Sequence, residues 1–161
     1  MANESVPHTN RHISLVRDLL YQFAVDVAAR GDVHDKSKFD PVEQGPLDEL
    51  QRLTDAEGPA AYGTPEYERR KTLLAPMIAH HHAVNSHHPE FYRPGHPDGT
   101  GIAGMDLLDL VEMFLDWRAA NVDRDGGAPM NLSYSIQKHG IPPMLESIFR
   151  NTAKRHGWAV K

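Results

Sequence analysis

The sequence predicts an all-α protein, a compact bundle of about five to seven helices. Three observations favour this class. Apolar residues recur at steps of three and four along most of the chain, which is the spacing of one helix face. Glycine and proline fall at the ends of these segments, where helices begin or stop. No segment of the 161 residues alternates apolar and polar residues in the manner of a half-buried strand.

The first helix is predicted from about Asn10 to Arg30, ended by Gly31. Residues three or four positions apart form its apolar face: Ile13, Val16, Leu19, Leu20, Phe23, Ala24 and Val27. Asp40 then precedes Pro41, and Glu43 follows in the position of a capping-box partner. This order predicts a second helix that begins at Pro41 and continues to about residue 55.

The remaining elements follow in chain order. Thr64 and Pro65 start a helix that is predicted to run to about Asn85. The segment 87–104 is rich in proline, glycine and histidine and is predicted to be an ordered loop. A strong helix is expected over about 106–122. A short helix and a longer one, the latter over about 143–156, close the chain.

Composition excludes several classes of protein. The 161 residues fit one domain, residues 1–161, and the values of 40% apolar and 24% charged residues are ordinary for a globular chain. With no cysteine, disulfides and cysteine-ligated metals are excluded. A net charge of −5 gives no sign of binding to polymeric nucleic acid. Neither a signal peptide nor a membrane span is recognisable, so a cytoplasmic protein without a membrane partner is expected.

Histidine is the compositional outlier, with 11 copies, five of them between His80 and His88. On a helix His81, Asn85 and His88 would share one face. Imidazoles so close together would repel one another if protonated, and a metal that takes neutral imidazole removes this repulsion. The sequence therefore indicates either a metal site within this run of histidines or a polar helix end exposed to solvent.

Other candidate ligands lie at a distance along the chain. His34 and Asp35 are adjacent and near a predicted helix end, where both side chains can turn toward one ion. His12 lies on the first helix near its apolar face. On the helix 106–122 a stripe of carboxylates faces either water or a cation-holding cleft, and helical phase leaves both possibilities open. The late candidates are Asp106, Asp109, Glu112 and Asp116.

Three local sequences resemble the HD-domain superfamily of metal-dependent phosphohydrolases. They are Arg11–Val16 (RHISLV), His34–Lys38 (HDKSK) and Leu115–Ala119 (LDWRA). The chain is closer still to a small phage and bacterial branch with the motifs HDxSKF, NxHHPE and EMxxDW, found here at 34–39, 85–90 and 112–117. These matches cover residues 12–117, and the C-terminal third carries no recognisable motif.

The resemblance implies an HD-like helical bundle that holds a divalent transition metal. One or two ions are expected, of Mn²⁺, Fe²⁺, Co²⁺, Ni²⁺ or Zn²⁺. The resemblance assigns the first metal to His12, His34, Asp35 and Asp116. Superfamily members with additional histidines between the His-Asp pair and the final Asp often bind a second metal. His81 and His88 are the candidates for it here, with His80 and His87 as the alternative register.

The function expected from the resemblance is hydrolysis of a nucleotide or another small phosphate ester by a metal-activated water. The candidate catalytic residues are Asp35, Lys38 and Glu112. Lys38 would pair with phosphate oxygens, and Glu112 would act as a general base or orient a ligand histidine. A di-iron oxygenase and a non-catalytic metal-binding protein are the alternatives. Helical HD proteins commonly form a homodimer, but the sequence leaves both the oligomeric state and the substrate open.

Overall fold

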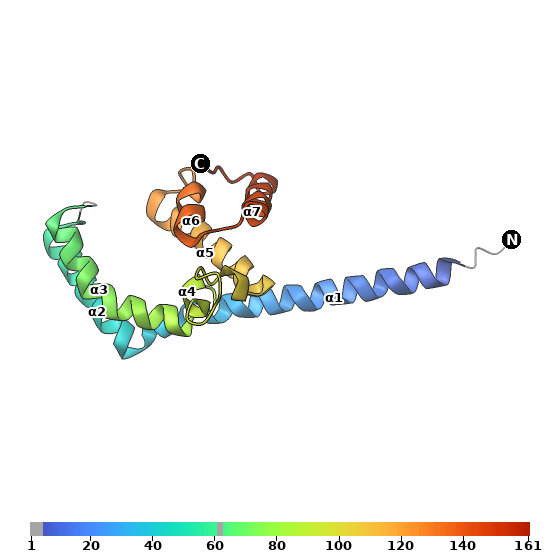
Figure 1. Ribbon diagram of the computed structural model, residues 1–161, viewed down its shortest axis with the longest axis horizontal. Coiled ribbons are helices and arrows are strands. Elements are labelled where there is room, and N and C mark those ends of the chain that lie inside the picture. The colour runs from blue at the N-terminus through green and yellow to red at the C-terminus, as the bar shows by residue number, and fades with distance from the viewer. Residues whose placement is uncertain (1–4, 61–62) are drawn as a thin grey trace. The chain divides into compact units, whose positions relative to one another are not determined.

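The protein is built from α-helices (Figure 1). The computed structural model describes residues 5–60 and 63–161, and the side chains of all of these except residues 124 and 125. Seven α-helices and two short 3₁₀ helices occur in these ranges, with no strand and one isolated parallel bridge between Met130 and Val160. The all-α prediction and the expected number of helices are confirmed. The chain forms two compact units, Met1–His34 and Asp35–Lys161, and the assignment of one domain stays a prediction.

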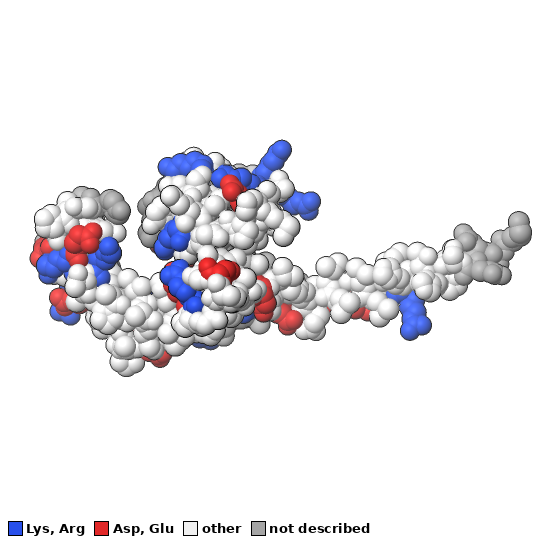
Figure 2. Space-filling view, in the orientation of Figure 1, with Lys and Arg blue, Asp and Glu red and all other residues white. Residues whose placement is uncertain are grey.

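The first unit consists mainly of one long helix, α1 (Ser5–Val33). The predicted end at Gly31 is wrong, because the backbone remains helical there and turns only at Asp35, whose φ of 54° is left-handed. None of the described residues of α1 is buried, and apolar side chains such as Leu19 and Leu20 are exposed. In Figure 2 most of the α1 surface in view carries neither acidic nor basic side chains. Within the described ranges, no helix has both the length and the apolar character needed to cross a membrane.

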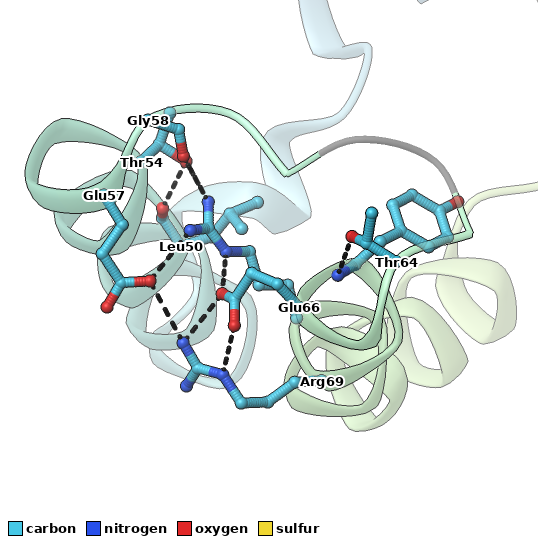
Figure 3. Close-up of polar contacts among 9 residues, drawn as sticks. Leu50, Thr54, Glu57, Gly58, Thr64, Glu66 and Arg69 are labelled. Atoms are coloured by element: carbon cyan, nitrogen blue, oxygen red, sulfur yellow. Dashed lines mark hydrogen bonds and ion pairs between the residues drawn. The ribbon is translucent and has the colours of Figure 1, made fainter.

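In the second unit, α2 (Pro41–Glu57) and α3 (Pro65–Val84) lie side by side as a helical hairpin (Figure 1). A polar network joins their far ends (Figure 3). Arg70, which is 5% exposed, donates to the carbonyl of Gly58 at 2.9 Å and pairs with Glu57 at 3.1 Å and with Glu66. Because a buried guanidinium is costly without partners, these contacts fix the two helices in register. The opposite end of the hairpin carries the histidine-rich segment.

An apolar core lies among α5 (Leu107–Asp125), α6 (Leu132–His139) and α7 (Pro143–Arg155). Trp117 and Trp158 pack against this core as partly buried side chains. The buried members of the core are Ile102, Met113, Phe114, Met130, Leu132, Ile141, Phe149 and Ala153.

The segment between α3 and α5 is anchored to α5 by one buried carboxylate. It contains the short helix α4 (Pro89–Tyr92) and a 3₁₀ turn, η2 (Ile102–Gly104), where the sequence predicts only a loop. Asp109 of α5 is 1% exposed and accepts hydrogen bonds from Ser86 Oγ at 2.7 Å and Tyr92 Oη at 2.6 Å. Burial, and then the neighbouring Asp109, raises the pKa of Tyr92 to about 12. Asp109 thus holds in place the turn that carries His87 and His88.

Candidate metal centre

Four side chains of the second unit bring their ligand atoms together. One ligand atom from each of Asp35, His81, His87 and His88 lies within 4.8 Å of the others. Asp35 precedes the 3₁₀ helix η1 (Lys36–Phe39), and His81 lies in the last turn of α3. His87 and His88 belong to the turn that leads into α4. Residues far apart in sequence therefore meet at the histidine end of the α2–α3 hairpin.

The spacing within this cluster matches the ligand sphere of a single ion. Asp35 Oδ1 lies 3.2 Å from His81 Nε2 and 3.4 Å from His87 Nε2. Two ligands bound about 2.1 Å from one ion lie roughly 3.0–3.4 Å apart in tetrahedral or octahedral geometry. The His88 ring is centred 4.2 Å from that of His87, and its Nε2 is buried without a hydrogen-bond partner among the described residues. This donor set fits a first-row divalent ion.

A buried carboxylate orients His81. Glu43, which is 0% exposed, lies 2.9 Å from His81 Nδ1 through Oε2 and 2.8 Å from His80 Nδ1 through Oε1. Burial by itself would raise the pKa of Glu43, but hydrogen bonds from His80, Ser37 and His81 outweigh it and lower this pKa. The predicted capping box at Asp40 is wrong, because the Glu43 side chain turns to the histidines of α3 instead.

A carboxylate of α5 holds His87 in a similar way. Its Nδ1 lies 3.1 Å from Oε1 of Glu112, a residue of α5. In both His81 and His87, then, Nδ1 faces a carboxylate while Nε2 faces Asp35. Metal-binding histidines are commonly held by such a carboxylate, which fixes the tautomer and raises the basicity of the other nitrogen.

The turn that follows α3 differs from the sequence expectation. The helix ends at Val84, and Asn85 is extended with φ −113°. Its Nδ2 donates to the carbonyl of His81 and to Ser37 Oγ, each at 2.8 Å. His88 precedes a proline and is extended, a conformation that proline imposes on the residue before it. The prediction that His81, Asn85 and His88 share one face of a helix is therefore wrong. His88 reaches the cluster through the turn instead.

Asp35 has an unusual backbone. It is the one non-glycine residue with positive φ in the part of the chain that the structure describes. Such conformations cost about 1–3 kcal/mol and are concentrated at functional sites. Lys38 Nζ contacts Asp35 Oδ2 at 2.6 Å, while Oδ1 faces the histidines. The left-handed turn thus directs the carboxylate toward the cluster.

The surroundings shift the pKa values of His88 and His81 in opposite directions. Burial lowers the pKa of His88 to about 2, with help from the neighbouring His87 and His81, so this ring is neutral. Burial also acts to lower the pKa of His81, but the hydrogen bonds and charges of Asp35 and Glu43 outweigh burial and raise it. Without a metal, His81 therefore tends to hold a proton between two carboxylates.

A cavity of about 570 Å³ opens onto the cluster, a size that suits a small ligand. Asp116 lines this cavity and is not a member of the four-residue cluster. Other residues of its lining are Asp35, Lys38, His81, His88, Ala119, Ala120 and Asp123.

The structure unites part of the residue set that the sequence singled out. Asp35 and both histidines of the favoured register meet, and His87 joins them from the alternative register. His12 and His34 belong to the first unit, and their role as ligands stays a prediction, as does that of Asp116. Glu43 was missed, because its partners lie 37 and 38 residues further along the chain and no local signal points to them.

These features define an all-helical protein with a buried histidine–aspartate cluster that is suited to a metal ion. The chain belongs to the family of unknown function DUF5662, whose model matches residues 1–155. Comparisons with curated proteins and with solved structures gave no match.

Proposed function

We propose that the protein is a metal-dependent phosphohydrolase that acts on a nucleotide or another small phosphate ester. The observation that carries this proposal is the double arrangement of His81 and His87, each held at Nδ1 by a carboxylate and presenting Nε2 to Asp35. The open cavity beside these residues leaves room for a substrate. A divalent ion bound there would supply a water of lowered pKa and a positive charge beside a phosphoryl oxygen.

Lys38 is the residue that we expect to bind the phosphate. Its side chain is 45% exposed, and it lines the cavity beside Asp35. An ammonium in this position can pair with phosphate oxygens. Glu112 contacts His87 Nδ1, which favours a positioning role for Glu112 over that of a general base. Asp116, which lines the same cavity, is proposed to complete the ligand set.

Lys38→Ala is expected to lower kcat/KM for phosphate release by about 10–100-fold, because a hydrogen bond to a charged group contributes about 1.5–3 kcal/mol. Lys36→Ala is the matched control: this lysine is exposed on the same 3₁₀ helix and lies outside the cavity lining, so its effect should stay within about twofold. The assay measures phosphate released from nucleotides and from p-nitrophenyl phosphate by the full-length chain loaded with Mn²⁺, Co²⁺ or Zn²⁺.

The same assay can contradict the proposal. A metal-loaded protein that releases no phosphate from any of these substrates is not a phosphohydrolase of this class. Oxygen consumption by the iron-loaded protein, without phosphate release, would support the di-iron oxygenase instead.

Metal binding and metal-free stability should respond to pH in opposite directions. Because the pKa of His81 is raised, its proton stabilises the folded metal-free chain at low pH, and this contribution is lost as pH rises through the raised pKa. A metal must displace that proton, so its affinity should fall about tenfold per pH unit below the same pKa. Thermal denaturation from about pH 6 to about pH 9, with and without Co²⁺, tests both trends. A metal affinity independent of pH over this range would contradict the assignment of His81 as a ligand.

A further inference from the structure

A second cavity adjoins the one at the cluster of Asp35 and three histidines (the Asp35 cluster). Its volume of about 530 Å³ is within the range of sites for small ligands. His88, Asp116 and Ala120 line both cavities, so the two meet beside the cluster. Most of the remaining wall comes from α5 and from the segment 130–139, which includes α6. A ligand bound at the cluster can therefore extend into the second cavity.

One face of α6 lines this second cavity with polar side chains. These residues lie three or four positions apart, so they share one side of the helix. They are Asn131, Tyr134, Ser135 and Lys138. On another face, Leu132 is buried in the apolar core and Ile136 packs against it. The core thus holds α6 in place while its polar face is left for the cavity.

The polar face offers hydrogen-bond donors that are not engaged elsewhere. Asn131 Oδ1 caps α6 by accepting from the Tyr134 N–H at 3.2 Å, so the amide turns its Nδ2 away from that bond. Within the part of the chain that the structure describes, neither a hydrogen bond nor an ion pair engages Asn131 Nδ2, the Tyr134 hydroxyl or the Lys138 ammonium. An amide N–H, a hydroxyl and an ammonium together suit a ligand group that is rich in acceptor oxygens.

The charges of the wall favour an anion at this face. Among the described residues that line the second cavity, Asp116 is the single carboxylate, and it lies where the two cavities meet. Lys138 is the single lysine or arginine there, and its side chain is exposed. The first cavity differs, because it contains Asp35, Asp116 and Asp123 together with Lys38. Each cavity therefore has one lysine available to an anionic group.

We propose that the small molecule bound at the metal centre carries a second negatively charged group, a phosphate or a carboxylate, which binds at the polar face of α6 beside Lys138. This inference rests on the proposed function and adds a substrate class to it, small phosphate esters with two anionic groups. The phosphate to be hydrolysed would lie at the Asp35 cluster beside Lys38. A substrate with one phosphate and no other charge would leave Lys138 unused.

The test compares substrates that differ by one charged group. With the Co²⁺-loaded, full-length chain, kcat/KM for phosphate release is measured for fructose bisphosphate against fructose monophosphate, and for phosphoglycerate against glycerol phosphate. The doubly charged member of at least one pair is expected to have a kcat/KM at least about tenfold higher, because it gains a hydrogen bond to a charged group. A preference in the first pair alone indicates a second phosphate, and a preference in the second pair alone indicates a carboxylate.

Lys138→Ala should remove most of this preference, while kcat/KM for the singly charged substrates stays within about twofold of the wild type. Lys154→Ala is the matched control, because Lys154 is also exposed in the last turn of its helix, α7, but lines neither cavity. Tyr134→Phe removes a single hydroxyl and should reduce the preference by a smaller factor, about two- to tenfold. Circular dichroism shows whether each variant is folded.

The proposal is overturned if the wild type prefers the doubly charged substrate in neither pair, or if the preference persists in folded Lys138→Ala. If none of the compounds releases phosphate, the hydrolase proposal fails, and calorimetric binding of the same compounds to the Co²⁺-loaded chain shows whether α6 binds an anion. Tighter binding of a doubly charged compound that Lys138→Ala removes would support the anion site. Equal binding within both pairs would overturn it.

Discussion

Replacing His81 with alanine is expected to weaken Co²⁺ binding at the Asp35 cluster by about two to three orders of magnitude. A structural metal site contributes roughly 10–16 kcal/mol, which for about four ligands is roughly 2.5–4 kcal/mol each. His81 is the ligand with the most contacts to carboxylates, since Nε2 faces Asp35 and Nδ1 faces Glu43. Its removal would also leave Glu43 buried with fewer donors. The measurement is the Co²⁺ dissociation constant of the metal-free, full-length chain.

Glu43→Gln tests how much the orientation of His81 contributes to metal binding, because it leaves His81 itself in place. The amide keeps the shape but loses the charge that holds His81 Nδ1, so Co²⁺ affinity should fall about 10–100-fold, less than for His81→Ala. His80→Gln is the matched control, because His80 contacts the other oxygen of Glu43 and is not a member of the cluster. Its affinity should stay within about threefold of the wild type. If His81→Ala binds Co²⁺ as tightly as the wild type, the cluster is not the metal site.

Gly101→Ala is expected to lower the free energy of unfolding by about 2–5 kcal/mol. Gly101 has φ 79°, which a residue with a side chain adopts only at a cost. A Cβ there would also lie 1.8 Å from the carbonyl oxygen of Pro89 and 2.8 Å from its carbonyl carbon. Because both are backbone atoms, α4 itself would have to move. Urea unfolding of the metal-free protein gives the free energy of unfolding.

Gly99→Ala provides the control for this change. Gly99 also has positive φ, 68°, but a Cβ would meet nothing within 4 Å, so only the backbone cost of about 1–2 kcal/mol applies. The difference between the two variants isolates the steric conflict with Pro89. Displacement of α4 should also weaken Co²⁺ binding in Gly101→Ala, since His88 and Glu90 flank Pro89. Equal destabilisation by both substitutions would show that Pro89 does not confine Gly101.

The sequence determined the helical class of this protein and most of its helix positions. Periodicity of three to four residues and terminal glycine or proline are local properties, and they located α2, α3, α5 and α7 to within a few residues. The wrong prediction that the first helix ends at Gly31 has a local cause as well. A glycine inside a helix costs only about 1 kcal/mol relative to alanine, which the neighbouring helical residues can offset.

The sequence also indicated which residues could form a metal site. Histidine enrichment and the adjacent His34 and Asp35 pointed to a metal, and Asp35 with His81 and His88 does meet in the folded chain. These residue types are informative by themselves, because few other roles explain several buried imidazoles beside a carboxylate.

Only the tertiary structure decided how these groups are arranged. Glu43 became the partner of His80 and His81 because α2 and α3 pair along their length, a contact that no local pattern encodes. The turn after α3 brought in His87 beside His88, where a single helix would have separated the two registers on different faces. Local periodicity specifies helices, whereas ligand geometry depends on contacts between residues distant in sequence, which form only when the chain has packed.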